Sequence, residues 1–66
     1  MNERIGDRIL KRRKELNMSQ EALSEKSNVN RVTISLLENG KCNDVLIGTL
    51  SAIASALDTT VEFFLN

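Results

Sequence analysis

The amino-acid sequence predicts an all-α fold. Two stretches, about 20–27 and 31–38, have the start and stop signals of short helices and are separated by the polar break Ser27-Asn28. Apolar residues never alternate with polar ones over the length of a strand, and the chain has no proline. With 66 residues, the chain forms one small domain, near the lower limit for folding without a metal or disulfide.

The first helix is expected from residue 2 or 3 to residue 16. One of its faces collects Ile5, Ile9, Arg12, Arg13 and Leu16, at helical spacing. The basic run at 11–14 is either a basic patch for a polyanion or an ordinary solvated helix surface. Met18 follows as a core residue.

The second helix is expected over 20–27 and the third over 31–38. Ser19 and Asn30 are good N-caps, because their side chains accept hydrogen bonds from the first free amides of a helix. Asn28 tolerates a left-handed backbone in the turn, and Gly40 ends the third helix for the same reason. Val29 is an apolar anchor between the two helices.

In the third helix, Ile34 and Leu37 lie on one face and point to the core. The opposite face carries Arg31, Val32, Ser35, Leu36 and Asn39. The two helices are too short to be stable alone, so together they form a helix-turn-helix that presents the second face outward.

A loop at 42–44 leads to the last two helices. Its Cys42 is either an inert thiol or a redox sensor. The fourth helix is expected from 45 or 46 to 57, with an apolar face made of Leu46, Leu50, Ile53, Ala54 and Leu57. The fifth, 61–65, closes the core with Val61, Phe64 and Leu65 and leaves Phe63 outside.

Composition excludes several classes of function. One cysteine and no histidine rule out an internal disulfide and the usual zinc fingers. Apolar runs of three residues cannot cross a membrane, and the N-terminus has no signal-peptide core, so we expect a cytoplasmic protein. Without a metal-ligand cluster or a Gly-rich phosphate loop, we predict no enzyme, no metal and no cofactor.

Charge is unevenly distributed although the net charge is zero. All nine Lys and Arg residues lie within residues 1–41, together with six acids, whereas residues 42–66 carry three acids and no base. A basic part and an acidic part can orient a protein on a polyanion, so we expect weak non-specific binding to nucleic acid.

Three motifs resemble those of the phage repressor/Cro-type (Xre) helix-turn-helix family, whose members are small helical DNA-binding proteins. They are Ser-Gln-Glu-x-Leu-Ser at 19–24, Val-Asn-Arg-x-Thr-Ile-Ser at 29–35 and Glu-Asn-Gly-Lys at 38–41. The resemblance covers nearly the whole chain and implies that residues 1–66 form a five-helix, lambda-repressor-like domain. The loop at 42–44 departs from the family in being one residue longer and in lacking its frequent proline.

The resemblance makes the third helix the one that enters the major groove of DNA, where residues near a helix N-terminus reach base edges. Arg31 can donate two hydrogen bonds to guanine, and Val32 can contact a thymine methyl. Ser35 can bond a base or a phosphate. Leu36 either packs on a thymine methyl or belongs to a wider core.

Other residues are expected to hold the DNA backbone. The candidates for phosphate contacts are Ser19, Gln20, Asn30, Thr33, Asn39, Lys41 and Arg13. The resemblance implies that Gln20 clamps the backbone and braces the third helix. It also implies an ion pair between Arg13 and Glu38.

The predicted function is a sequence-specific transcriptional regulator, a repressor or controller that blocks or recruits RNA polymerase. A homodimer would bind a near-palindromic double-stranded operator, with an interface formed by Val61, Phe63 and Phe64. Phe63 has an alternative place, folded back over the first or fourth helix. A second function remains open: a protein-interaction or antitoxin-like module, favoured by the zero net charge, Val32 and Leu36.

Overall fold

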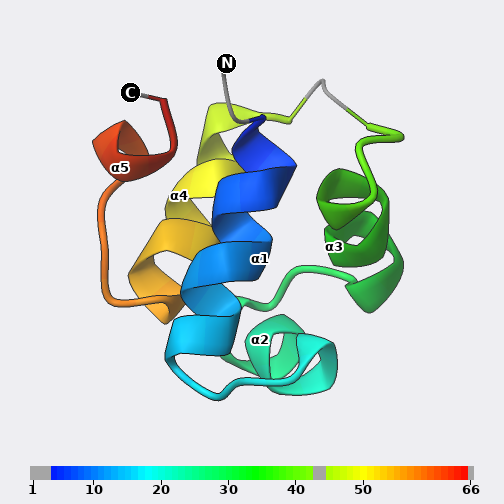
Figure 1. Ribbon diagram of the computed structural model, residues 1–66, viewed down its shortest axis with the longest axis vertical. Helices are drawn as coiled ribbons and strands as arrows, with labels where there is room; N and C mark the ends of the chain where they lie inside the picture. Colours follow the sequence, from blue (N-terminus) through cyan, green and yellow to red (C-terminus); the bar gives the residue numbers. More distant parts are fainter. Residues whose placement is uncertain (1–3, 43–44, 66) are drawn as a thin grey trace.

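The computed structural model describes residues 4–42 and 45–65 and contains five helices: α1 (Ile5–Glu15), α2 (Gln20–Ser27), α3 (Arg31–Glu38), α4 (Ile47–Ala56) and α5 (Val61–Leu65). Figure 1 shows α1 in the centre, α2 below it, α3 on one side and α4 and α5 on the other. Within these two ranges there is no strand, so the all-α prediction is confirmed. No described helix is long and apolar enough to span a bilayer.

The bounds of α2, α3 and α5 agree with the sequence prediction because local signals set them. Ser19 Oγ accepts a hydrogen bond from the Ala22 amide at 3.0 Å, and Asn30 Oδ1 accepts one from the Val32 amide at 2.7 Å. Asn28 takes a left-handed conformation, with φ of 61°. Gly40, with φ of 72°, stops the chain from continuing α3.

The ends of α1 and α4 differ from the prediction. The expected start of α1 at residue 2 or 3 lies outside the described residues, as does the loop at Asn43 and Asp44, and α1 ends at Glu15. Helix α4 begins at Ile47, and Leu46 is its extended N-cap with ψ of 144°. Leu46 is therefore 77% exposed, and its assignment to the apolar face of α4 was wrong.

The core is a single cluster to which all five helices contribute. Its fully buried side chains are Ile9, Leu23, Ile34, Leu50, Ile53 and Leu57, and Met18 and Val29 pack against its edge as predicted. Leu65 is 55% exposed instead of closing the core. Val61 and Phe64, three residues apart, occupy the inner face of the short α5, and the next residue turns away from it.

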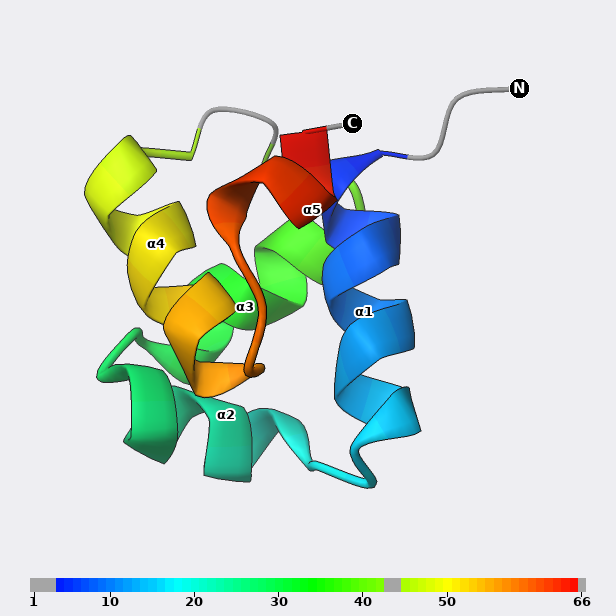
Figure 2. The ribbon, with the colours of Figure 1, turned by 90° about the vertical axis from the view of Figure 1, so that its left-hand side faces the viewer.

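Helix α1 is bound to its neighbours by contacts that span the chain. A Cβ added to Gly6 would overlap the Leu37 carbonyl group, so the backbones of α1 and α3 touch there. Arg12 Nε donates to the Leu57 carbonyl oxygen at 2.9 Å, at the C-terminal end of α4. Arg8 Nη1 donates to the Phe63 carbonyl oxygen at 2.9 Å. These contacts fix α3, α4 and α5 around α1, and Figure 2 shows α5 lying between α1 and α4.

Candidate nucleic-acid interface

One face of α3 is turned to solvent. Arg31 is exposed, Val32 is 58% exposed and Leu36 is 40% exposed, whereas Ser35 is half-buried. On the opposite face, Ile34 and Leu37 lie in the core. Leu36 is outside the core cluster, so the alternative of a wider core is wrong.

A buried ion pair holds the end of α3 against α1. Arg13 Nε lies 2.8 Å from Glu38 Oε2, and Arg13 Nη2 lies 2.9 Å from Glu38 Oε1. The Glu38 side chain is only 4% exposed and that of Arg13 only 12%. The hydrogen bonds to Glu38 raise the pKa of Arg13 above its ordinary value, although desolvation acts in the opposite direction. The pair that the family resemblance implies is thus present.

Gln20 connects this ion pair to the exposed face of α3. Its Nε2 donates to Glu38 Oε1 at 2.9 Å, and its Oε1 accepts from Arg31 Nη1 at 3.5 Å. Glu38 therefore contacts α1 through Arg13 and α2 through Gln20. One set of hydrogen bonds therefore holds the orientation of α3 and also reaches Arg31, the first residue of its exposed face.

The expected phosphate-contacting residues are not equivalent in the structure. Ser19 and Gln20 lie at the N-terminus of α2, where the free amides and helix dipole favour an anion. Lys41 is exposed beyond the end of α3, and Asn39 is exposed with Nδ2 3.4 Å from Ser35 Oγ. Asn30 is exposed as well, with Oδ1 engaged in its capping bond.

Two members of that set are poorly placed for a phosphate. Thr33 is half-buried and lines a hollow between α3 and the start of α4. Arg13 donates to both carboxylate oxygens of Glu38 and, through Nη1, to the Met18 carbonyl oxygen at 2.8 Å. Arg13 therefore holds α3 from inside the protein.

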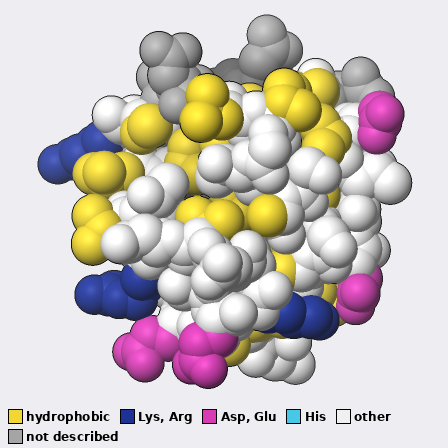
Figure 3. All heavy atoms as spheres, turned by 180° about the vertical axis from the view of Figure 1, so that it is seen from behind, with side chains coloured by type: hydrophobic (Ala, Val, Ile, Leu, Met, Phe, Trp, Pro, Cys, Tyr) yellow, Lys and Arg dark blue, Asp and Glu magenta, His cyan; other side chains and the backbone are white. Residues whose placement is uncertain are grey.

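The surface over α3 is basic and apolar. Figure 3, which views the molecule from behind, shows Lys or Arg side chains and hydrophobic side chains along the edge over α3. Most of the acidic side chains in that view lie along the lower and opposite edges. This arrangement agrees with the uneven charge of the sequence and favours approach of a polyanion to α3.

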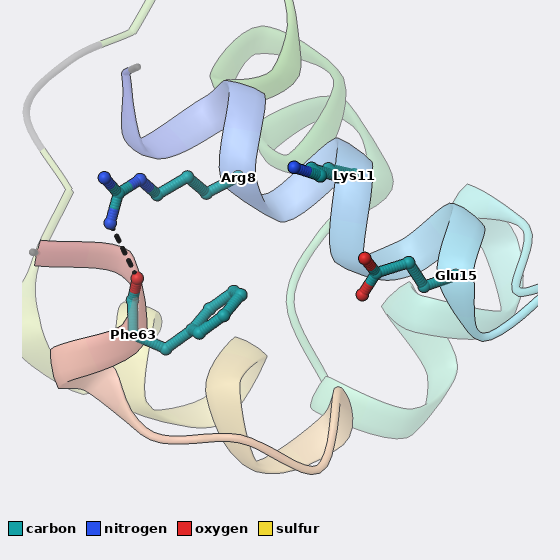
Figure 4. A pocket seen from close by; sticks show the side chains of 4 residues that line it. All are labelled: Arg8, Lys11, Glu15 and Phe63. Carbon is teal, nitrogen blue, oxygen red and sulfur yellow. Dashed lines mark hydrogen bonds between the residues drawn. The ribbon is translucent and has the colours of Figure 1, made fainter. Parts of the chain in front are cut away.

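The three residues expected at a dimer interface do not form one exposed surface. Phe64 is 2% exposed and lies in the core, so its assignment to an interface was wrong, and Val61 is half-buried. Phe63 is 45% exposed. Its ring is directed toward α1 and borders a groove of about 270 Å³ with Arg8, Lys11 and Glu15, as Figure 4 shows. This is the folded-back position that the sequence left open.

The predictions on metal binding and on Cys42 concern residues away from the exposed face of α3. Among the described residues, no group of His, Cys, Asp and Glu could hold a metal ion. Cys42 is half-buried beside the same hollow as Thr33. The contacts of Arg8 and Arg12 to backbone carbonyl groups were not predicted, because no local pattern in the sequence signals a bond across 45 or more residues.

Comparison with known proteins agrees with this geometry. The helix-turn-helix family model matches residues 9–64. The structure of SinR, the master regulator for biofilm formation, in complex with DNA is similar, with 32% identity and a TM-score of 0.91 over 94% of this chain and 98% of that chain. The DNA-binding domain (1–76) of the P22 C2 repressor is 33% identical, with a TM-score of 0.88 over 98% of this chain and 86% of that chain.

No curated protein matches the chain in sequence. The family match nevertheless extends over most of the chain, and both similar structures are DNA-binding regulators or domains of them. The chain belongs to the helix-turn-helix family of phage repressor/Cro type, a family of DNA-binding transcription regulators.

Proposed function

We propose that this protein binds a near-palindromic operator as a dimer, with the α3 of each copy in the major groove. The observation that carries the proposal is the exposed face of α3, held in place from behind by Glu38 through Arg13 and Gln20. A rigid helix with a free outer face meets the requirement of major-groove reading, since base edges must be met at fixed positions.

The residues on this face suggest a mixed recognition code. Arg31 is the donor for the O6 and N7 atoms of a guanine. Val32 and Leu36 have no polar side-chain atoms, so they contact thymine methyl groups, and Ser35 bonds a base or a phosphate. Contacts from Ser19, Gln20, Asn30, Asn39 and Lys41 to phosphates fix the register without reading sequence.

Selection of binding sites from random duplexes tests the proposal. We expect inverted half-sites whose centres lie about 34 Å apart, one helical turn, with a guanine and neighbouring thymines in each half. Sites without inverted symmetry would contradict the dimeric arrangement. Sites without a recurring guanine would contradict the role of Arg31.

A protein-interaction module is the second candidate function. It is favoured by the exposed apolar side chains Val32 and Leu36 and by the zero net charge. Duplex titrations at two salt concentrations separate the two functions. A loss of affinity of several logarithmic units per tenfold rise in salt supports the DNA-binding function, because phosphate contacts release counterions. No binding at low salt supports the interaction module.

A further inference from the structure

The first turns of α4 form an unusual surface. Residues 45–57 contain no charged residue in a chain that is 27% charged. At the start of this stretch, Leu46 is 77% exposed and Ile47 is 65% exposed, the highest values for large hydrophobic side chains in the described part of the chain. Gly48 and Ser51 are also exposed, and Ser51 lies four residues after Ile47, on the same side of the helix.

We propose that this surface, the α4 patch (Leu46, Ile47, Gly48 and Ser51), is the contact with a second copy of the chain on the operator. The inference rests on the proposed function and assigns the surface through which the dimer forms. Exposed apolar side chains combined with a lack of charge are typical of the centre of an interface, where charged residues are depleted.

The chemistry of the patch fits a second copy of this chain. In a two-fold contact the same surface meets itself, so any charged side chain on it would approach its own like charge. The α4 patch has no charge and avoids this repulsion. It also offers no charged group with which to select a partner of opposite sign.

The size of the molecule limits where the two copies can meet. The Cα extents are 30 × 20 × 20 Å. Reading helices in successive major grooves lie about 34 Å apart. Copies placed at this spacing are close to contact, so the end of the molecule that faces the operator dyad forms the interface.

Only one end suits this contact. Figure 1 shows that α3 begins at the end of the molecule where α2 lies and rises toward the end where α4 begins. The α2 end exposes three charged residues, Glu21, Glu25 and Lys26, which would have to be desolvated in a contact with a second copy. The other end exposes Lys41 as well, but also the apolar side chains of Leu46 and Ile47. Apolar contact therefore favours the α4 end at the dyad.

A hollow beside the patch provides shape for the contact. It has a volume of about 180 Å³ and is lined by Thr33, Leu37, Cys42, Val45, Leu46 and Thr49. Figure 3 shows hydrophobic side chains gathered at the upper end of the back face. An apolar side chain of the second copy that enters this hollow would contact Thr33 and Leu37 of α3. The contact would therefore also stabilise the position of α3.

The patch is too small for a stable dimer in dilute solution. Four residues bury far less than the roughly 800 Å² per partner of a standard interface. On an operator, however, the neighbouring half-site holds the second copy at a high effective concentration. We therefore expect monomers in solution and cooperative binding to DNA.

The experiment compares duplexes that carry one half-site with duplexes that carry two inverted half-sites. We expect the wild-type protein to bind the second half-site at least about tenfold more tightly than an isolated one. Ile47→Glu removes this gain and leaves the affinity for one half-site unchanged. A glutamate in the first turn of α4 suits the helix dipole, so the variant folds.

Phe63→Glu is the matched control, because it places the same charge at another exposed apolar residue, outside the patch. It keeps the cooperative gain. The proposal is overturned if the wild-type protein shows no gain or if Ile47→Glu retains it. It is also overturned if Phe63→Glu alone removes the gain, since the contact would then lie on α5.

A second measurement does not depend on DNA. In a Cys42→Ser background, Ile47→Cys is compared with Phe63→Cys for the rate of disulfide-linked dimer formation at high protein concentration. Faster cross-linking of the Ile47→Cys variant supports the α4 patch, and equal or slower cross-linking contradicts it. If the protein binds no duplex, the proposed function fails while this measurement still decides whether the surface associates.

Discussion

Removal of the Glu38 charge tests whether the interior contacts hold the reading helix. In Glu38→Gln the shape of the side chain is kept, but Arg13 loses the carboxylate that receives its Nε and Nη2 donors at 2.8 and 2.9 Å. The Arg13 side chain is 12% exposed, so water replaces the lost partner poorly. The guanidinium nevertheless stays charged in the variant, because arginine does not lose its proton in proteins.

Breaking a desolvated ion pair from one side costs about 3–5 kcal/mol. A chain of this length has a free energy of unfolding of roughly 3–10 kcal/mol, so the loss is a large part of the total. It lowers the melting temperature by at least about 12 °C. The double variant Arg13→Met/Glu38→Leu replaces both partners and leaves no uncompensated charge. We therefore expect it to be more stable than Arg13→Met alone or Glu38→Leu alone.

Urea unfolding followed by circular dichroism measures these differences. Glu15→Gln is the control, because it removes an ion pair with Arg12 whose side chains are 51% and 26% exposed. The control loses at most about 1 kcal/mol, as expected for a surface pair. A loss below 1 kcal/mol in Glu38→Gln, or strictly additive effects in the double variant, would refute the reasoning.

Further predictions concern DNA reading and backbone packing. Arg31→Ala relaxes the preference at one guanine per half-site by about 1–3 kcal/mol. Lys41→Ala weakens binding to all sequences alike, and the slope of the logarithm of the binding constant against the logarithm of the salt concentration becomes smaller by about one. Identical sequence profiles for the two variants would contradict this division. Gly6→Ala destabilises the fold by about 1–3 kcal/mol or more, because its Cβ would overlap the Leu37 carbonyl group. Gly48→Ala, whose Cβ meets no atom within 4 Å, stabilises α4 by about 0.5–1 kcal/mol. Urea unfolding measures both changes in the free energy of unfolding, which we expect to be negative for Gly6→Ala and positive for Gly48→Ala.

Features fixed by neighbouring residues were predictable from the sequence. Ser19 and Asn30 mark the starts of α2 and α3, and Gly40 marks the end of α3, because capping depends on a few adjacent backbone groups. The division of α3 into a buried face with Ile34 and Leu37 and an outward face follows from helical periodicity alone.

Features fixed by tertiary contacts were not predictable in this way. Leu46 satisfies the helical spacing of α4, but it is the N-cap before the helix and has an extended backbone, so its side chain is exposed to water. Leu65 satisfies the spacing of α5, whose single turn has room for only two inward side chains. The bond from Arg12 to the Leu57 carbonyl group depends on how α1 crosses α4, which no local pattern encodes.

The connection of Glu38 to three helices has a consequence for how this protein can diversify. The residues that hold α3 lie beneath it, whereas Arg31, Val32 and Leu36 are exposed and lie outside the core. Substitutions at those outer positions can therefore accumulate at low thermodynamic cost. A lineage could acquire new target sites by changing three or four surface codons while the scaffold stays the same.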